Sequence, residues 1–191
     1  LMAQSLLTFV ISGTHFHWFS YLTGQGISDE IAVSSIAISP LAGIPVTLLA
    51  GFLAERVHVR YILIVAYICF AGTMVLFVYA STPLMAYAFA IALGASSGVT
   101  FTLSMIVWAD YYGRQSIGAI RGLTAPVTML TNALGPFLAA LTFDVTGSYS
   151  LILWSFVAIC CGSTIFWFLA IPPNQRETVT HVESSRRTDD R

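Results

Sequence analysis

His15 and His17 are titratable side chains that lie well inside an apolar segment of this chain. An imidazole titrates near neutral pH, so either ring could relay a proton or pair with an anion. Positions two apart on a helix project about 200° away from each other, so at most one ring can face a given cavity. The alternative is that each histidine is buried and hydrogen-bonded to a neighbouring helix.

Hydroxyl and amide side chains, which could bind a solute by hydrogen bonding, are concentrated in three of the apolar segments. They are frequent in residues 31–54, 84–108 and 118–143 and sparse in residues 61–80 and 150–171. Polar groups prefer protein or water to lipid, so we expect the three polar segments to face inward and the two others outward. Alternatively, each hydroxyl only bonds back to its own helix. The candidate residues for a solute cavity are His15, Ser35, Ser39, Thr100, Ser104, Thr128 and Asn132.

Six apolar segments must position these side chains, and each is long enough to cross a bilayer. A helix needs about 20 apolar residues to cross ~30 Å of hydrocarbon, with all its backbone polar groups paired. Only 9% of the 191 residues are charged and 57% are hydrophobic, which is too little charge to cover a soluble domain. The sequence therefore predicts an all-α membrane protein with six transmembrane helices. We expect one bundle over residues 1–171, with helices at about 1–22, 31–54, 61–80, 84–108, 118–143 and 150–171, and a disordered cytoplasmic tail over residues 172–191.

All eight basic residues are arginines, and they lie in alternate gaps between the apolar segments or in the tail. Short loops that stay in the cytoplasm retain Lys and Arg, so the alternation places the tail in the cytoplasm. We expect an integral membrane protein of the plasma (bacterial inner) membrane, in contact with the lipid bilayer. The net charge of −1 gives no case for nucleic-acid binding. The three cysteines fall inside apolar segments, so neither a metal site nor a cofactor is expected.

Prolines in the middle of a segment occur only in the second segment, at Pro40 and Pro45, and in the fifth, at Pro126 and Pro136. These two segments are the middle members of two consecutive sets of three. Matching interruptions of this kind point to an internal inverted repeat with a transport pathway beside it. The alternative is coincidence between two helices that each contain proline.

A glycine pattern from Gly94 to Gly98 matches the letters of the hydrolase elbow G-x-S-x-G. That elbow needs a turn from strand to helix and acid and histidine partners. Here the pattern lies in the middle of an apolar segment, so we predict a close helix-packing face, repeated at Gly118 and Gly122. The chain is not expected to be an enzyme.

The gap after the second segment carries a recognisable loop motif, GFLAERVHVR at residues 51–60. It resembles the motif of the major facilitator superfamily, in which a glycine is followed four residues later by an acid–arginine pair and further basic residues. Glutamate replaces the usual aspartate, and residues 58 and 59 depart from the usual glycine and arginine. Such weakening is common in the C-terminal repeat of that family. The candidate residues of a cytoplasmic gate are Gly51, Glu55, Arg56, Arg60 and Arg114.

Two later stretches make the resemblance more specific. DYYGR at residues 110–114 precedes the fifth segment, and NALGP at residues 132–136 lies within it. Together they resemble the monocarboxylate-porter and oxalate–formate-antiporter branch of the superfamily. Members of that branch that bind carboxylates often carry a basic residue deep in the second or fifth helix, whereas this sequence has only Ser, Thr and Asn at that depth.

The resemblance implies the C-terminal six-helix half of a twelve-helix secondary transporter, with Leu1 the edge of a longer chain. Such a protein would move a small organic solute, such as a monocarboxylate-like anion, by alternating access. The partner of this bundle would be the N-terminal six-helix half. The alternative is a six-span scaffold protein that transports nothing, and cysteine accessibility at Thr100, Thr128 and Asn132 would distinguish the two.

Overall fold

The computed structural model describes residues 2–112 and 117–169, and these form α-helices joined by short connections, with no strand among the described residues. The tail predicted over residues 172–191 lies outside this part of the chain. The chain is therefore all-α, as the sequence predicts. The helices are α1 (Met2–Gly24), α2 (Asp29–Ala54), α3 (Val59–Val78), α4 (Pro83–Tyr112), α5 (Ile117–Thr146) and α6 (Ser150–Leu169).

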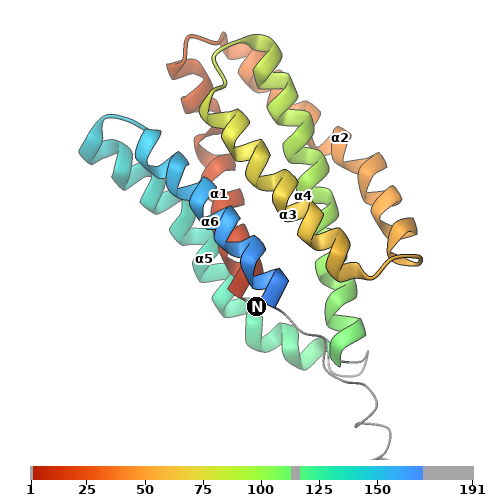
Figure 1. Ribbon diagram of the computed structural model, residues 1–191. Helices are drawn as coiled ribbons and strands as arrows, with labels where there is room; N and C mark the ends of the chain where they lie inside the picture. Colours follow the sequence, from red (N-terminus) through yellow and green to blue (C-terminus); the bar gives the residue numbers. More distant parts are fainter. Residues whose placement is uncertain (1, 113–116, 170–191) are drawn as a thin grey trace, which may run out of the picture.

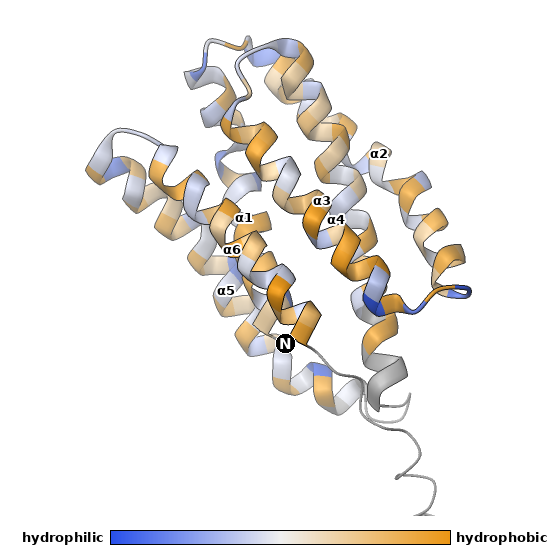
Figure 2. Cartoon of the chain, in the orientation of Figure 1, coloured by the Kyte–Doolittle hydropathy of each residue, from blue (hydrophilic) through white to orange (hydrophobic). Residues whose placement is uncertain are grey.

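Five of these helices, α2 to α6, are long and apolar enough to cross a membrane within the described residues. The exception, α1, has the length but carries Ser12, Thr14, His15 and His17 in its central turns. A helix of this polarity is stable at membrane depth when other helices cover it. Accordingly, α1 packs against α5, α6 and α2. Figure 2 shows hydrophobic residues along the middle of the helices and hydrophilic ones near several connections.

The helices form two layers, with α3 and α6 side by side in front of α1, α2, α4 and α5 (Figure 1). The most extensive contacts are those of α2 with α4 and of α1 with α5, followed by those that α3 and α6 make with α4, with α1 and with each other. If α1, α2 and α3 are matched with α4, α5 and α6, every contacting pair of helices has a contacting counterpart. The contact of α2 with α4, for example, corresponds to that of α1 with α5. The packing therefore has the internal repeat that the matched prolines predict.

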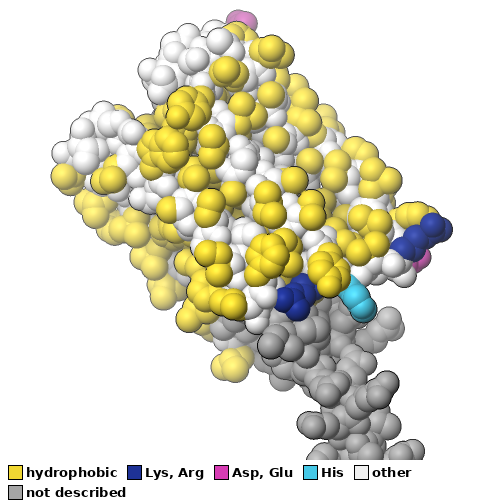
Figure 3. All heavy atoms as spheres, viewed as in Figure 1, with side chains coloured by type: hydrophobic (Ala, Val, Ile, Leu, Met, Phe, Trp, Pro, Cys, Tyr) yellow, Lys and Arg dark blue, Asp and Glu magenta, His cyan; other side chains and the backbone are white. Residues whose placement is uncertain are grey.

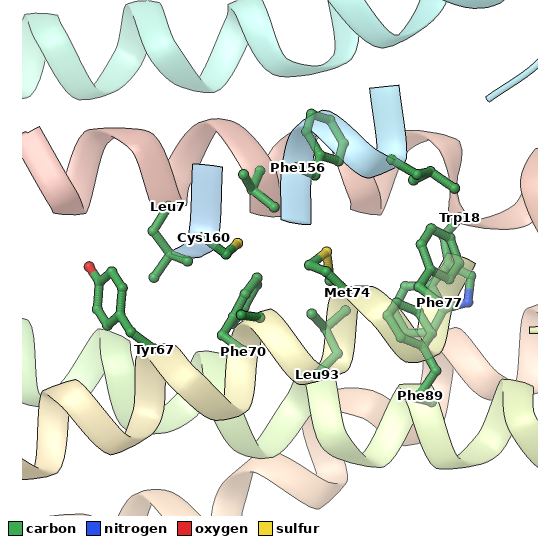
Figure 4. Close-up of a cluster of buried hydrophobic side chains, with 14 of the residues drawn as sticks. Leu7, Trp18, Tyr67, Phe70, Met74, Phe77, Phe89, Leu93, Phe156 and Cys160 are labelled. Atoms are coloured by element: carbon green, nitrogen blue, oxygen red, sulfur yellow. The ribbon is translucent and has the colours of Figure 1, made fainter. Parts of the chain in front are cut away.

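Large side chains fill the space between the two layers (Figure 4). The rings of Phe77 and Phe89 stack at 4.2 Å between centroids, and Trp18 meets Phe89 edge-on at 4.8 Å. Farther along, Tyr67 and Phe70 of α3 are also fully buried. As a result α3 is the most buried of the five apolar spans, and α2 and α5 are the most exposed. Apolar rather than hydroxyl side chains therefore fill the core of this bundle, and the expected division into helices that face a cavity and helices that face lipid stays a prediction.

Glycines let two helix pairs touch through their backbones. A Cβ added to Gly94 of α4 would meet the carbonyl oxygen of Ser39 and lie 2.7 Å from its carbonyl carbon. A Cβ added to Gly98 would meet the hydroxyl of Thr47 and lie 3.1 Å from the carbonyl oxygen of Gly43, both on α2. The matching crossing of α1 and α5 is made at Gly135, which faces the carbonyl oxygen of Phe9. The close-packing face predicted at Gly94 and Gly98 is therefore confirmed.

The second glycine pair does not pack in the same way. Nothing within the described residues lies within 4 Å of a Cβ added to Gly118 or Gly122. The repeat of the packing face predicted there is wrong for this bundle, because neither glycine faces a neighbouring helix among the described residues.

Candidate functional site

The layer of α1, α2, α4 and α5 contains two cavities lined partly by polar side chains. The first, of about 550 Å³, lies between α1, α4 and α5. It combines one guanidinium with an amide and several hydroxyls on an otherwise apolar wall. Its polar lining residues are Gln4, Thr8, Ser104, Arg121, Thr124 and Thr128.

The second cavity, of about 510 Å³, lies between α2 and α4, beside α1. His15 contributes the titratable group, and Ser39, Thr47 and Ser97 contribute the hydroxyls. The rest of the wall is apolar or glycine. This cavity adjoins the backbone crossing at Gly94, so its shape depends on how closely α2 and α4 approach.

The hydroxyls of the first cavity, and that of Ser97 in the second, donate their hydrogens to their own helices. Ser104 donates to the carbonyl of Phe101 at 2.8 Å, and Thr128 donates to that of Thr124 at 3.1 Å. Because a hydroxyl has one hydrogen and two lone pairs, its oxygen still accepts hydrogen bonds. The hydroxyls therefore offer acceptors to a solute, whereas the charged donor on the first cavity wall is Arg121.

Four of the seven predicted cavity residues line one of the two cavities. His15 and Ser39 line the second cavity, and Ser104 and Thr128 line the first. The remaining three residues line neither. Ser35 and Thr100 are buried between helices and donate back to Ala32 at 2.7 Å and to Ser96 at 2.9 Å. Asn132 is exposed on α5.

Sequence reasoning missed Arg121 as a cavity residue, because all eight arginines were interpreted as residues of the gaps or the tail, although the predicted segment 118–143 includes this one. The structure includes this residue in α5, which begins at Ile117, and places it on the wall of the first cavity. Its spacing from Thr124 and Thr128, at three and seven residues, puts all three on one face of a helix. That spacing is the signal that could have found it.

The two histidines have different surroundings, as their helical spacing predicts. His17 is hydrogen-bonded through Nε2 to the carbonyl oxygen of Pro136 and through Nδ1 to the hydroxyl of Tyr149, both at 3.1 Å. A carbonyl can only accept, so Nε2 carries a hydrogen and a neutral ring accepts from Tyr149 at Nδ1. Burial, with a smaller contribution from Asp144, raises the pKa of Tyr149, which keeps its donor hydrogen. His17 therefore joins α1 to α5 and α6, whereas the exposed ring of His15 meets the edge of Trp18.

The loop after α2 places the predicted gate residues in separate surroundings. Gly51 lies in α2, Glu55 caps its C-terminal end, and the guanidinium of Arg56 lies 4.5 Å from the ring centroid of Phe52. Arg60 donates from Nε to the carbonyl of Trp167 at 3.1 Å and from Nη2 to that of Phe168. These carbonyls belong to the last turn of α6, which a cation stabilises. The predicted gate residue Arg114 lies outside the described residues.

Metal chemistry has no candidate in the part of the chain that the structure describes, since no three His, Cys, Asp or Glu side chains gather there as ligands.

The comparison with protein families decides the identity. The sequence profile of the Major Facilitator Superfamily matches residues 1–188. The chain belongs to the major facilitator superfamily. This is a family of transporters rather than enzymes, so the helices of this major facilitator protein are those of an integral membrane transporter in contact with lipid. No curated protein matches the chain.

Proposed function

We propose that this chain is the C-terminal half of a secondary transporter that moves a small organic anion, such as a monocarboxylate, by alternating access. The observation that carries the proposal is the first cavity, where Arg121 shares a wall with Gln4, Ser104 and Thr128. A guanidinium binds a carboxylate through two parallel hydrogen bonds, and the binding is strong where water is scarce. The amide of Gln4 adds a second donor.

The exposed side chains on α5 support a second bundle opposite this layer. Leu123, Met129 and Leu130 are each more than half exposed, although they flank the polar wall of the cavity. A second six-helix bundle would cover these side chains and close the cavity, which one bundle leaves open. We propose the N-terminal half of the same transporter as this partner.

The charged ends of the helices support the proposed orientation and gate. Arg56 and Arg60 follow α2, and Arg121 lies near the start of α5, so these arginines occupy one end of the bundle. Short basic loops remain in the cytoplasm, so we assign this end and the C-terminal tail to the cytoplasm. In the proposal Gly51, Glu55, Arg56, Arg60 and Arg114 form the cytoplasmic gate of this half.

The test is uptake of radiolabelled monocarboxylates by the full-length protein in proteoliposomes. Arg121→Gln should raise KM by about 10–100-fold, because a hydrogen bond to a charged group contributes about 1.5–3 kcal/mol. Arg121→Lys, which keeps the charge but loses the two-pronged geometry, should lie between Gln and the parent. An unchanged KM in Arg121→Gln would refute carboxylate recognition at this cavity.

A matched pair of threonine variants tests the wall itself. Thr128→Val removes an acceptor from the first cavity, whereas Thr142→Val removes a hydroxyl that is exposed elsewhere on α5 and also donates within its helix. Only the former should weaken uptake. If the folded full-length protein takes up no small organic acid, the scaffold alternative replaces the proposed function.

A further inference from the structure

An apolar groove runs between α2 and α3, with α4 as its floor. It has a volume of about 280 Å³ and is almost entirely apolar. Leu49 and Leu53 of α2 form one wall, and Val65 and Cys69 of α3 form the other. Although α2 and α3 are consecutive, they touch little, so the groove stays open along their length.

This groove is separate from the proposed solute pathway. The cavity beside His15 and the groove share no lining residue, although both use α2 and α4. On α4 the cavity is lined by Gly94 and Ser97, whereas the groove is lined by Ser96 and Val99. These two pairs of residues project to roughly opposite sides of the helix. The α2–α4 crossing therefore stands between them. In the proposed transporter the second bundle covers the cavity side and leaves the groove facing lipid.

The groove leads to a basic loop. Its end at Leu53 and Ile62 lies about one helical turn from Arg56 and His58, which are both exposed. Figure 3 shows basic side chains at the right-hand and lower borders of the coloured surface, with a His side chain at the lower border and hydrophobic side chains between and above them. Glu55 is the acidic group in this loop, and the other arginine, Arg60, is bonded to the end of α6. Arg56 is thus the cation available beside the groove.

We infer that this groove binds an anionic phospholipid, with one acyl chain lying between α2 and α3 and the phosphate at Arg56. The groove extends from Leu53 to Val46 on α2, about 10 Å at 1.5 Å per residue, which suits the upper part of a chain in a ~15 Å leaflet. Basic residues at the cytoplasmic ends of such grooves select anionic headgroups. The binding does not depend on which solute the protein moves.

The test uses the full-length protein in nanodiscs and measures quenching of tryptophan fluorescence by brominated lipids. Val65→Trp places an indole on the groove wall at a position that is 59% exposed, so the variant should fold. Ile68→Trp is the matched control, because Ile68 is 53% exposed on the same helix but does not line the groove. The signal is the difference from the parent protein, because this chain alone contributes four tryptophans of its own.

Brominated phosphatidylglycerol should quench the indole in Val65→Trp about five-fold more effectively than brominated phosphatidylcholine, since one basic residue contributes about 1 kcal/mol. The two lipids should quench equally in Ile68→Trp. Adding Arg56→Gln to Val65→Trp should abolish the preference, and adding Arg56→Lys should keep it.

Three results would overturn the inference. Equal quenching by both lipids in Val65→Trp would show a groove without headgroup selection. Quenching by neither lipid would show that another part of the protein covers the groove. Stronger quenching by brominated phosphatidylethanolamine than by brominated phosphatidylglycerol would indicate that Glu55, rather than Arg56, binds the headgroup.

Discussion

Replacing Gly94 by alanine is the most direct test of the packing between α2 and α4. A methyl group at this position would fall on the carbonyl oxygen of Ser39, 2.7 Å from its carbonyl carbon and 3.2 Å from its Cα. These atoms are helix backbone and cannot rotate away. The substitution therefore has to push the two helices apart.

The required movement and its cost follow from these distances. Carbon atoms pack at about 3.5–4.0 Å, so the helices must separate by at least about 0.8 Å, and closer contact with the oxygen demands more. Overpacking of this kind costs about 1–3 kcal/mol. Alanine is more favourable than glycine in a helix by about 1 kcal/mol, which offsets part of the overpacking cost. Gly94→Ala should therefore lower the free energy of unfolding by up to about 2 kcal/mol.

Gly72→Ala in α3 is the matched control, because nothing among the described residues lies within 4 Å of a Cβ at that position. It should be neutral or stabilising by about 0.5–1 kcal/mol. Both variants of the full-length protein can be compared by thermal unfolding in nanodiscs at one scan rate. If Gly94→Ala is as stable as Gly72→Ala, the bare backbone contact described for α2 and α4 is wrong.

Three further predictions concern the ends of the bundle. His17→Phe should lower the free energy of unfolding by about 1–3 kcal/mol, and a double-mutant cycle with Tyr149→Phe should show coupling, since the two side chains share a hydrogen bond; additive effects would contradict the bond. Arg60→Ala should cost about 1.5–3 kcal/mol in thermal unfolding, because the last carbonyls of α6 lose a charged donor; a negligible change would show that this cap is dispensable. Cysteines introduced at Val57 and Ser148 should react with an impermeant maleimide from opposite sides of the membrane, and labelling from the same side would refute the topology.

The helices were predictable because bilayer thickness and backbone hydrogen bonding leave few alternatives to an apolar segment of this length. The internal repeat was visible in the matched prolines of α2 and α5, and the close approach in the glycine pair from Gly94 to Gly98. These features are local in sequence, so their spacing alone describes them.

The candidate site was less predictable, because hydroxyl composition does not say which side of a helix faces a cavity. Ser35 and Thr100 were expected at the cavity but are buried between helices, while Ser39 and Thr128 lie on cavity walls, and a role of either in solute binding stays a prediction. Arg121 was overlooked because the arginines were used only to assign the topology, although this residue lies in the predicted segment and in α5. Those outcomes depend on helix rotation and on contacts between distant segments, which a single sequence does not specify.

The helices α1–α3 contact α4–α6 in a symmetric way, because each contact of one set has a counterpart in the other set. This symmetry has a consequence for motion. Any sliding of α2 across α4 has a counterpart in sliding of α1 across α5, so the bundle has two equivalent ways to tilt. The two crossings differ in what lies beside their glycines, since Gly94 meets only the backbone of Ser39 whereas the ring of Phe156 lies over Gly13 at the other crossing. A preference for one tilt over the other would therefore have to come from the residues that differ between the two crossings, not from those that they share.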